Sequence, residues 1–467
     1  MQLTNSASTS NLNFQQQLLE NFIDRYINKT QTSKQLTQVY RSVLADRRNS
    51  MEFHKVFKEM VYPIIGKRAS GSKMWDIDGN EYLDLVMGFG VNLFGHNPSF
   101  IKEAIQERLE QGIHIGPQSD LAGEVAQLFC ELTGMERVTF SNTGTEAVMT
   151  AIRLARATTV RQKIAMFAGS YHGHFDGTLV KRQKIDDQFI VVPRFPGVLP
   201  NVAQDILVLD YGDFKSLEII KAYQHELAAV LVEPIQDERP DIQPQDFLVQ
   251  LREITQKSGI ALIFDEMLTG FRIHLGGAQA WFGIEADIAT YGKIVGGGLP
   301  IGIIAGKAAY MDRIDGGMWN YGDASFPQVE TTFFAGTYCK HPLAMAAARA
   351  VLKYLQSQGN ALQQQLNERT SQFVKKLNTY FQEDEVPIRL ANCGSIFTSV
   401  SLGNAVDSED SASGNLDLIF YHLISRGVFM IPNGGLLSTA HTDEDLEYII
   451  QAVKDSIKEL RESGFLP

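Results

Sequence analysis

The segment Ala261-Leu262-Ile263-Phe264-Asp265-Glu266 sets four consecutive apolar residues directly before two acids. Such a run is typical of a buried strand whose end delivers polar groups to one edge of a sheet. Similar apolar runs occur at residues 138–140, 163–167, 206–209, 228–232 and 301–305, with helical patterns in most of the intervals. Because strands alternate with helices, the sequence predicts an α/β fold with a mostly parallel sheet that helices cover on both faces.

The N-terminal region has a different pattern from this α/β core. Residues 1–13 are almost all Ser, Asn, Thr and Gln, which predicts a disordered lead-in. Apolar residues then recur at helical spacing between Phe14 and Ile27, so we expect a helical arm that lies on the body of the protein or on a partner. Further on, the turn at residues 78–80 separates two short alternating runs and predicts a β-hairpin.

The chain divides into four predicted parts. The arm covers residues 1–50, the N-terminal part of a small domain covers 51–98, the large domain covers 99–335 and the C-terminal small domain covers 336–467. The last part should form a smaller α+β unit. It combines a predicted long helix over 342–381, strands near 396–402 and 428–431, and a closing helix from residue 443.

Composition excludes several classes of protein. The 42 basic and 54 acidic residues give a net charge of −12, which disfavours binding to nucleic acid and to anionic membrane surfaces. The three cysteines form no CxxC pair, so neither a disulfide framework nor a metal site is expected. The most apolar stretch, residues 294–306, is too short and too rich in Gly and Pro to span a bilayer, and no signal peptide is recognisable. We therefore expect a cytoplasmic protein.

Polar residues follow several of the predicted strands, where open parallel sheets bind ligands. After the run at 138–140 come Thr143, Gly144 and Thr145, directly before a predicted helix. Backbone N–H groups at a helix start, two hydroxyls and a glycine can hold a phosphate. The same residues can equally form an ordinary helix cap, with Glu146 completing a capping box.

Three further places carry candidate groups. Asp265 ends a buried strand, where a carboxylate needs either a protonated nitrogen or a structural ion pair. Lys293 lies between small and apolar residues, and a desolvated lysine is a nucleophilic amine, although most lysines are solvated surface charges. Tyr171 and His172 follow the run at 163–167, where the tyrosine either stacks on a flat ring or packs within a loop.

Together these groups match the requirements of one cofactor, pyridoxal 5′-phosphate (PLP): a phosphate cradle, an acid for the ring nitrogen, an aromatic face and a Schiff-base lysine. Over about residues 60–462 the sequence resembles the class III aminotransferases of PLP fold type I, and within them the glutamate-1-semialdehyde aminomutases. The motifs that carry the resemblance are WDIDGNEY from Trp75, GHNP from Gly95, SNTGTEA from Ser141, YHGH from Tyr171, VEPIQ from Val232, FDEMLTGFR from Phe264, GKIVGGGLP from Gly292 and GT from Gly336.

The resemblance implies a role for each matching residue. Lys293 would bind PLP as a Schiff base, Asp265 would bond the pyridine nitrogen and Tyr171 would stack on the ring, so these three are the expected catalytic residues. Thr337 would reach the phosphate from the neighbouring subunit of a homodimer. The other residues expected to bind the cofactor are Thr143, Gly144, Thr145, His172, Glu233 and Gln236.

The expected substrate pocket departs from the family pattern. Phe89 lies where aminomutases carry a pocket aromatic, but Gly434 and Gly435 stand where relatives place a charged gate. We therefore expect an open pocket without a clamp for a substrate carboxylate. Leu268 likewise stands where many relatives have a glutamine that contacts the cofactor.

Segments 29–38, 43–46 and 437–445 resemble aminotransferase domains of polyketide and non-ribosomal peptide synthases. That resemblance implies transfer from an amino-acid donor to a β-keto acyl thioester on an acyl carrier protein. Carrier proteins are usually acidic, so docking on this acidic chain needs a local basic patch, which we expect at Lys181, Arg182 and Lys184. Two alternatives stay open: a glutamate-1-semialdehyde-type 2,1-aminomutase, and a catalytically inactive PLP-fold module with a regulatory or scaffold role.

Overall fold

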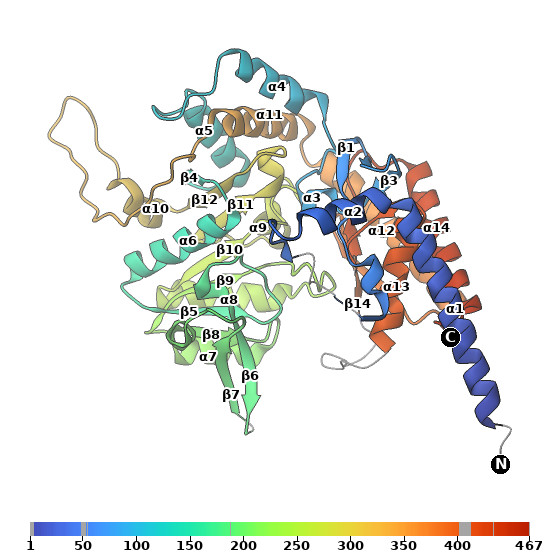
Figure 1. Cartoon of the computed structure of the whole chain (residues 1–467). Helices are drawn as coiled ribbons and strands as arrows, with labels where there is room; N and C mark the ends of the chain where they lie inside the picture. The colour runs from blue at the N-terminus through green and yellow to red at the C-terminus, as the bar shows by residue number, and fades with distance from the viewer. Residues whose placement is uncertain are drawn as a thin grey trace.

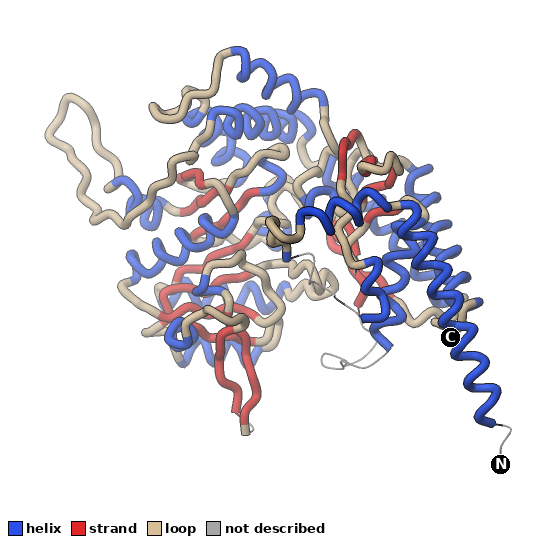
Figure 2. Tube along the Cα trace, in the orientation of Figure 1, coloured by secondary structure: helices blue, strands red, loops and turns tan. Residues whose placement is uncertain are grey.

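The computed structural model describes residues 4–47, 53, 55–186, 188–400, 412–432 and 434–466. Figure 1 shows a larger α/β part, built on a central sheet, beside a smaller part in which both ends of the chain lie. Figure 2 shows the same two parts by secondary structure, with the strands of the larger part stacked between helices.

A seven-stranded sheet forms the core of the larger part, in the order β4-β12-β11-β10-β9-β5-β8. The neighbouring pairs from β11 to β8 are parallel, whereas β12 is antiparallel to both of its neighbours. The predicted α/β fold with a mostly parallel sheet is confirmed. The strands are β4 Arg137–Ser141, β5 Lys163–Phe167, β8 Ile206–Leu209, β9 Leu227–Val232, β10 Ala261–Asp265, β11 Ile288–Gly292 and β12 Gly302–Gly306.

One strand of this sheet, β11, was not predicted, although the other six lie within one residue of the predicted runs. In β11, Thr290 and Gly292 interrupt the apolar residues, so the strand lacks the continuous apolar run that marks its neighbours. Its complete burial comes from its place between β10 and β12. Tertiary position, rather than local composition, makes this segment a core strand.

Helices cover both faces of the sheet, as predicted (Figure 1). Ala229 packs in the cluster with α6 and α10, whereas its neighbour Val230 packs in the cluster with α5 and α8, because side chains alternate between the two faces of a strand. The helices of the larger part are α4 Ser99–Glu110, α5 Ala122–Thr133, α6 Gly144–Thr159, α7 Phe214–Ala222, α8 Gln245–Ser258, α9 Gly277–Phe282, α10 Ala308–Asp315 and α11 Pro342–Gln358, with short turns η3 Asp176–Thr178, η4 Pro200–Asp205 and η5 Lys293–Gly296. Two antiparallel strands, β6 Val180–Ile185 and β7 Gln188–Pro193, form a projecting hairpin.

The smaller part draws on both ends of the chain. The hairpin predicted around residues 78–80 is present as β2 and β3, and β15 from the C-terminal region pairs in parallel with β3. A second sheet has the order β13-β14-β16. The elements are η2 Lys55–Met60, β1 Gly66–Ser70, β2 Lys73–Asp76, β3 Glu81–Asp84, α3 Met87–Gly90, α12 Ala361–Glu383, β13 Arg389–Cys393, β14 Ile396–Val400, α13 Ala412–Ser425, β15 Val428–Phe429, β16 Gly434–Leu436 and α14 Asp443–Glu462.

The N-terminal arm lies on this smaller part of its own chain. It consists of α1 Thr4–Lys29 and α2 Gln31–Tyr40. The ring of Phe22 stacks on that of His422 at 3.9 Å, and Tyr26 is buried beside Tyr421. The disordered lead-in predicted for residues 1–13 is wrong from Thr4 onward, because a helix started on a packed segment extends at little cost into a polar neighbour; residues 1–3 lie outside the described residues.

The single helix predicted over 342–381 is two helices, α11 and α12, in the structure. Gly359 separates them with φ 58° and ψ −153°, a conformation that glycine adopts without steric cost and that ends the first helix. The predicted strand near 396–402 ends at Val400 as far as it is described. Among the described residues, no helix combines the length and the apolar character needed to cross a membrane.

Candidate active site

A cavity of about 380 Å³ lies where β4, β9, β10 and β11 end. These are the carboxyl ends of parallel strands, where ligands bind in open α/β sheets. The cavity brings together most of the residues predicted from the sequence. Its walls include Thr143, Gly144, Thr145, Tyr171, His172, Glu233, Asp265 and Lys293.

Lys293 follows β11 directly and begins the short turn η5. Its φ of 43° lies in the left-handed region, which is unusual for a residue with a side chain. Burial lowers the pKa of Lys293, against the opposing influence of Asp265 and Glu233. The shift enlarges the fraction of neutral amine, which is the nucleophilic form.

Asp265 ends β10 and is buried. One carboxylate oxygen accepts a hydrogen bond from the Met267 backbone N–H at 3.1 Å and from Thr290 Oγ1 at 3.3 Å, and the other lies 2.7 Å from His172 Nδ1. The buried Nε2 of His172 has no hydrogen-bond partner in the described structure. His172 therefore both lines the cavity and orients the carboxylate of Asp265.

The predicted phosphate cradle and the ordinary helix cap are both present at the start of α6. Thr143 and Glu146 form a capping box, in which the Glu146 backbone N–H donates to Thr143 Oγ1 at 3.1 Å. Gly144 and Gly173 are packed closely against their neighbours, since a Cβ at these positions would come 2.8 Å from Met267 Sδ and 2.5 Å from Thr145 Oγ1. The backbone N–H groups of the helix start and the hydroxyls of Thr143 and Thr145 together fit a phosphate group.

Tyr171 and Glu233 also line the cavity. Tyr171 is 62% exposed, so it is available for a ligand, and its backbone N–H donates to Glu233 Oε2 at 3.2 Å. Burial, reinforced by Asp237 and Asp265, raises the pKa of Glu233 well above its ordinary value. A buried carboxyl with a raised pKa can hold or release a proton inside the cavity.

Gln236 does not line the cavity as described, although it was predicted to bind the cofactor. Its side-chain Nε2 donates to the carbonyl oxygen of Ala168 and to Ser170 Oγ, both at 2.9 Å. Gln236 therefore holds the loop that leads into Tyr171. Thr337 lies outside this cavity too, in a separate hollow of about 410 Å³ with Lys340 and His341.

The glycines expected to open the substrate pocket are packed instead. Gly434 and Gly435 are buried in β16, where an added Cβ would come 2.2 Å from the carbonyl oxygen of Phe397 and 2.9 Å from Leu85 Cβ. The expectation of open space here is wrong, because atoms of Phe397 and Leu85 occupy the volume that a side chain at these positions would need. Phe89 is 66% exposed and is not among the described lining residues.

Four residues in or beside the cavity were not assigned a role by the sequence analysis. Met267 and Asp237 line the cavity, Thr290 bonds to Asp265, and Arg272 lies behind the wall. Met267 could have been found, because it follows the Asp265-Glu266 pair, whereas Thr290 depends on recognising β11.

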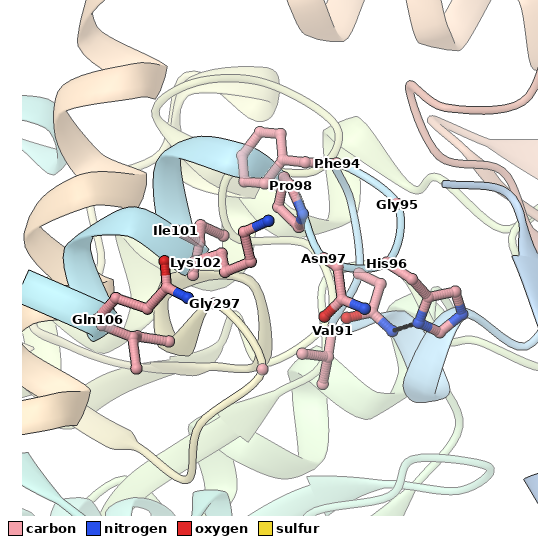
Figure 3. Close-up of a pocket in the computed structure, with 13 residues that line it drawn as sticks. Val91, Phe94, Gly95, His96, Asn97, Pro98, Ile101, Lys102, Gln106 and Gly297 are labelled. Atoms are coloured by element: carbon pink, nitrogen blue, oxygen red, sulfur yellow. Dashed lines mark hydrogen bonds between the residues drawn. The ribbon is translucent and has the colours of Figure 1, made fainter. Parts of the chain in front are cut away.

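Beside the cavity lies a second hollow of about 210 Å³, shown in Figure 3, and Val91 belongs to the walls of both.

Comparison with known proteins assigns the family. The family model for "Aminotransferase class-III" matches residues 56–455. The chain belongs to the class III aminotransferases. A glutamate-1-semialdehyde 2,1-aminomutase from Desulfitobacterium hafniense is 36% identical over 408 residues, which are 85% of this chain and 91% of the relative.

Solved structures match this class III aminotransferase over nearly its whole length. An omega-transaminase from Sphaerobacter thermophilus has a TM-score of 0.82 at 29% identity, covering 92% of this chain and 98% of that one. A transaminase with PLP bound has a TM-score of 0.81 at 27% identity, covering 93% and 99%. The fold is therefore PLP fold type I, and the enzyme is a PLP-dependent one.

The cavity of the class III aminotransferase fits this cofactor. Thr143, Gly144 and Thr145 offer the phosphate site, buried Asp265 suits a protonated ring nitrogen, and Lys293 supplies the amine. When bound, PLP supplies an electron sink for carbanions at the substrate carbon. The protein's own part would be to orient the ring and to move a proton through the amine of Lys293.

Proposed function

We propose that this enzyme transfers an amino group from an amino-acid donor to the carbonyl group of a second substrate that carries no free carboxylate beside that carbonyl. A β-keto acyl thioester on an acyl carrier protein is such an acceptor. One observation supports the proposal: among the described residues that line the cavity, Lys293 is the only lysine or arginine. The described part of this wall therefore offers no arginine that could clamp a carboxylate in bidentate fashion.

Each residue of the cavity has a separate role in the proposed reaction. Asp265, oriented by His172, Thr290 and the Met267 backbone N–H, holds the proton of the ring nitrogen. Lys293 takes a proton from the donor carbon as a base, because burial lowers its pKa and enlarges the fraction of neutral amine, and it later gives a proton to the acceptor carbon. Tyr171 covers one face of the ring, and Met267 packs beside Gly144.

The test follows the nitrogen atom. The enzyme is incubated with PLP, a ¹⁵N-labelled amino-acid donor and a synthetic β-keto acyl thioester, and the product is analysed by mass spectrometry. We expect the label in the acceptor product and the keto acid derived from the donor in equal amount. Product whose nitrogen does not come from the donor contradicts the proposal.

A second candidate function has direct support from the relatives. The Desulfitobacterium protein is named a glutamate-1-semialdehyde 2,1-aminomutase, and it aligns with 85% of this chain. Such an enzyme moves nitrogen within one molecule. Incubation with glutamate-1-semialdehyde alone separates the two candidates, since an aminomutase forms 5-aminolevulinate without an added donor.

We also propose that the enzyme acts as a homodimer in which Thr337 serves the cavity of the neighbouring subunit. Thr337 is exposed and does not line the cavity around its own Lys293. The segment that contains it also exposes several large apolar side chains, as expected for a surface that a second copy covers. These are Met318, Tyr321, Phe326, Phe333 and Tyr338.

The proposed docking site for a carrier protein lies on the β6–β7 hairpin. Arg182 is already engaged, because it forms a two-bond ion pair with Asp210 at 2.8 and 2.6 Å and lies 4.2 Å from the ring of Phe189. Lys181 is exposed on the same strand. Compared with the wild type, Lys181→Glu should have a higher KM for a carrier-bound acceptor and an unchanged KM for a free thioester. If its KM for the carrier-bound acceptor equals that of the wild type, Lys181 is not part of the docking site.

A further inference from the structure

A buried arginine lies behind the wall of the active-site cavity. Arg272 is 0% exposed, and the hydrogen bonds that its guanidinium makes go to neutral oxygens. Burial lowers its pKa to about 9. Burying a guanidinium without a counter-charge costs folding free energy, so its hydrogen bonds must compensate for that cost.

Arg272 binds three segments from distant parts of the chain. Its Nε donates to the carbonyl oxygen of Leu268 at 3.2 Å, Nη1 donates to Ser395 Oγ at 2.7 Å, and Nη2 donates to the carbonyl oxygen of Gly90. Leu268 lines the cavity, and Gly90 directly precedes Val91, which also lines it. Arg272 thus joins the Leu268 loop of the cavity wall to two segments of the smaller part, one that ends beside Val91 and one that leads into β14.

Apolar packing supports the same junction. Leu268 forms a small buried cluster with Ile396 and Leu436, which belong to β14 and β16 of the smaller part. Ser395, which accepts from Arg272, directly precedes Ile396. The contact between the cavity wall and the smaller part is therefore both apolar and hydrogen-bonded at one place.

The turn that Arg272 holds is strained. Residues 87–90 have φ angles of 47, 62, 55 and 93°, all in the left-handed region. Two of the four, Met87 and Phe89, are not glycine, and left-handed backbone is sterically unfavourable for such residues. Strain persists only where the surroundings impose it. Asp84 fixes the start of the turn by accepting from the backbone N–H groups of Val86 and Met87, and Arg272 fixes its end.

We propose that Arg272 is a positioning residue that clamps two segments of the smaller part, the strained turn at 87–90 and Ser395, to the Leu268 loop, and thereby fixes the cavity wall formed by Val91 and Leu268. The importance of this wall for catalysis rests on the proposed function, whereas the clamp itself does not. The guanidinium has a second effect, because its charge lowers the pKa of Lys293 in the same direction as burial does.

Three variants test the clamp. Arg272→Met removes both the charge and the fork, Arg272→Lys keeps a charge but loses the fork, and Ser395→Ala removes one acceptor while leaving the arginine in place. Arg252→Met is the matched control, since Arg252 has a mostly buried side chain but pairs with Asp287, away from the cavity residues.

The first readout is amide hydrogen exchange of the peptide 86–93 in each full-length variant. We expect about tenfold faster exchange in Arg272→Met, which corresponds to the loss of one or two net hydrogen bonds, a smaller change in Ser395→Ala, and none in Arg252→Met. Unchanged exchange in Arg272→Met, or an equal change in the control, overturns the clamp. If Arg272→Met does not fold, Arg272→Lys and Ser395→Ala decide, and unchanged exchange in both overturns it.

The second readout is the pH at which borohydride traps PLP on Lys293. Loss of the positive charge in Arg272→Met should move the trapping profile to higher pH, whereas Arg272→Lys should keep it in place. A merely structural role would not separate these two variants, so coincident profiles contradict the electrostatic part. Hydrogen exchange needs no turnover, so it tests the clamp independently of the reaction. If Arg272→Met shows faster exchange but the wild type lacks the proposed activity, the proposed function is refuted and the clamp is not.

Discussion

Lys293 and Asp265 meet because their strands are neighbours. Asp265 on β10 is paired with Thr290 on β11, and Lys293 lies three residues after Thr290, directly after the end of β11. The sequence singles out each residue by its local setting, an acid at the end of an apolar run and a lysine beside three glycines. Their common cavity, and the hydrogen bond from Thr290 to Asp265, depend on β11, which local composition does not reveal.

Replacing the active-site lysine tests the central assignment. Lys293→Ala should lower turnover by at least about 1,000-fold and abolish the visible absorbance that PLP gains when bound to a lysine, because the variant loses both the amine and the proton carrier. The measurement is an absorbance spectrum with a single-turnover assay. Lys307→Ala is the control, since Lys307 pairs with Asp287 and does not line the cavity. Multiple turnovers by Lys293→Ala would contradict the assignment.

Glu266, next to Asp265, predicts a pH-dependent stability. Burial raises the pKa of Glu266 to about 7, although it accepts from the Ala278 and Gln279 backbone N–H groups and from Thr269 Oγ1. A carboxyl whose folded pKa lies above its unfolded value stabilises the fold below about pH 4.5, and this contribution is lost as the pH rises through 7.

Glu266→Gln should therefore remove this pH dependence. The free energy of unfolding of the wild type relative to the variant should fall by up to about 3 kcal/mol between pH 4.5 and 8, measured by denaturant titration at several pH values. Glu253→Gln, at an exposed position, should show no such trend. Parallel pH profiles for wild type and Glu266→Gln would show that the buried carboxyl titrates near its ordinary pKa.

At the scale of elements, helix α1 acts as a brace for the smaller part. Phe22 stacks on His422, and Glu459 of α14 pairs with Arg25 of α1, with Arg426 and with His422. Helical periodicity alone predicted the arm but left its contact open between the body and a partner. The structure places it on the body, since its apolar face meets side chains from α13 and η2.

Phe22→Ala should cost about 3 kcal/mol of stability, because it removes a buried ring and leaves a cavity against His422. Arg25→Ala should cost about 1 kcal/mol or less, since its ion pair with Glu459 is exposed to solvent on the arginine side. Denaturant unfolding of both variants provides the comparison. Equal costs for the two variants would mean that the arm is held by charge rather than by the buried ring.

At the scale of the whole molecule, the proposed dimer makes a prediction about mixed subunits. Lys293→Ala and Thr337→Ala chains are unfolded together and refolded to form hybrids. If Thr337 serves the neighbouring cavity, each hybrid has one intact cavity, formed by Lys293 of one chain and Thr337 of the other. Activity should then recover to about half of the wild-type value per hybrid dimer, by the symmetry of a twofold interface.

A lack of recovery in the hybrids would contradict the proposed role of Thr337. If Thr337 acts within its own chain, no hybrid contains an intact cavity, and mixing restores nothing above the activity of the Thr337→Ala parent. The hybrid fraction is measured by tagging one chain and isolating dimers that carry a single tag. Recovery in samples that contain no hybrid would point to an incompletely inactivated parent and is excluded by assaying each variant alone.

The sequence by itself determined what depends on neighbours along the chain: the alternation of strands and helices, the cap before α6, the hairpin at residues 78–80, and the chemistry of Asp265 and Lys293. Tertiary structure alone decided which distant groups share space. It made β11 a core strand, placed Gln236 behind the Tyr171 loop, filled the room beside Gly434 with the backbone of Phe397, and buried Arg272 among three segments. The physical reason is that side-chain type and periodicity act over a few residues, whereas burial and distance are set by the packing of segments far apart in the chain.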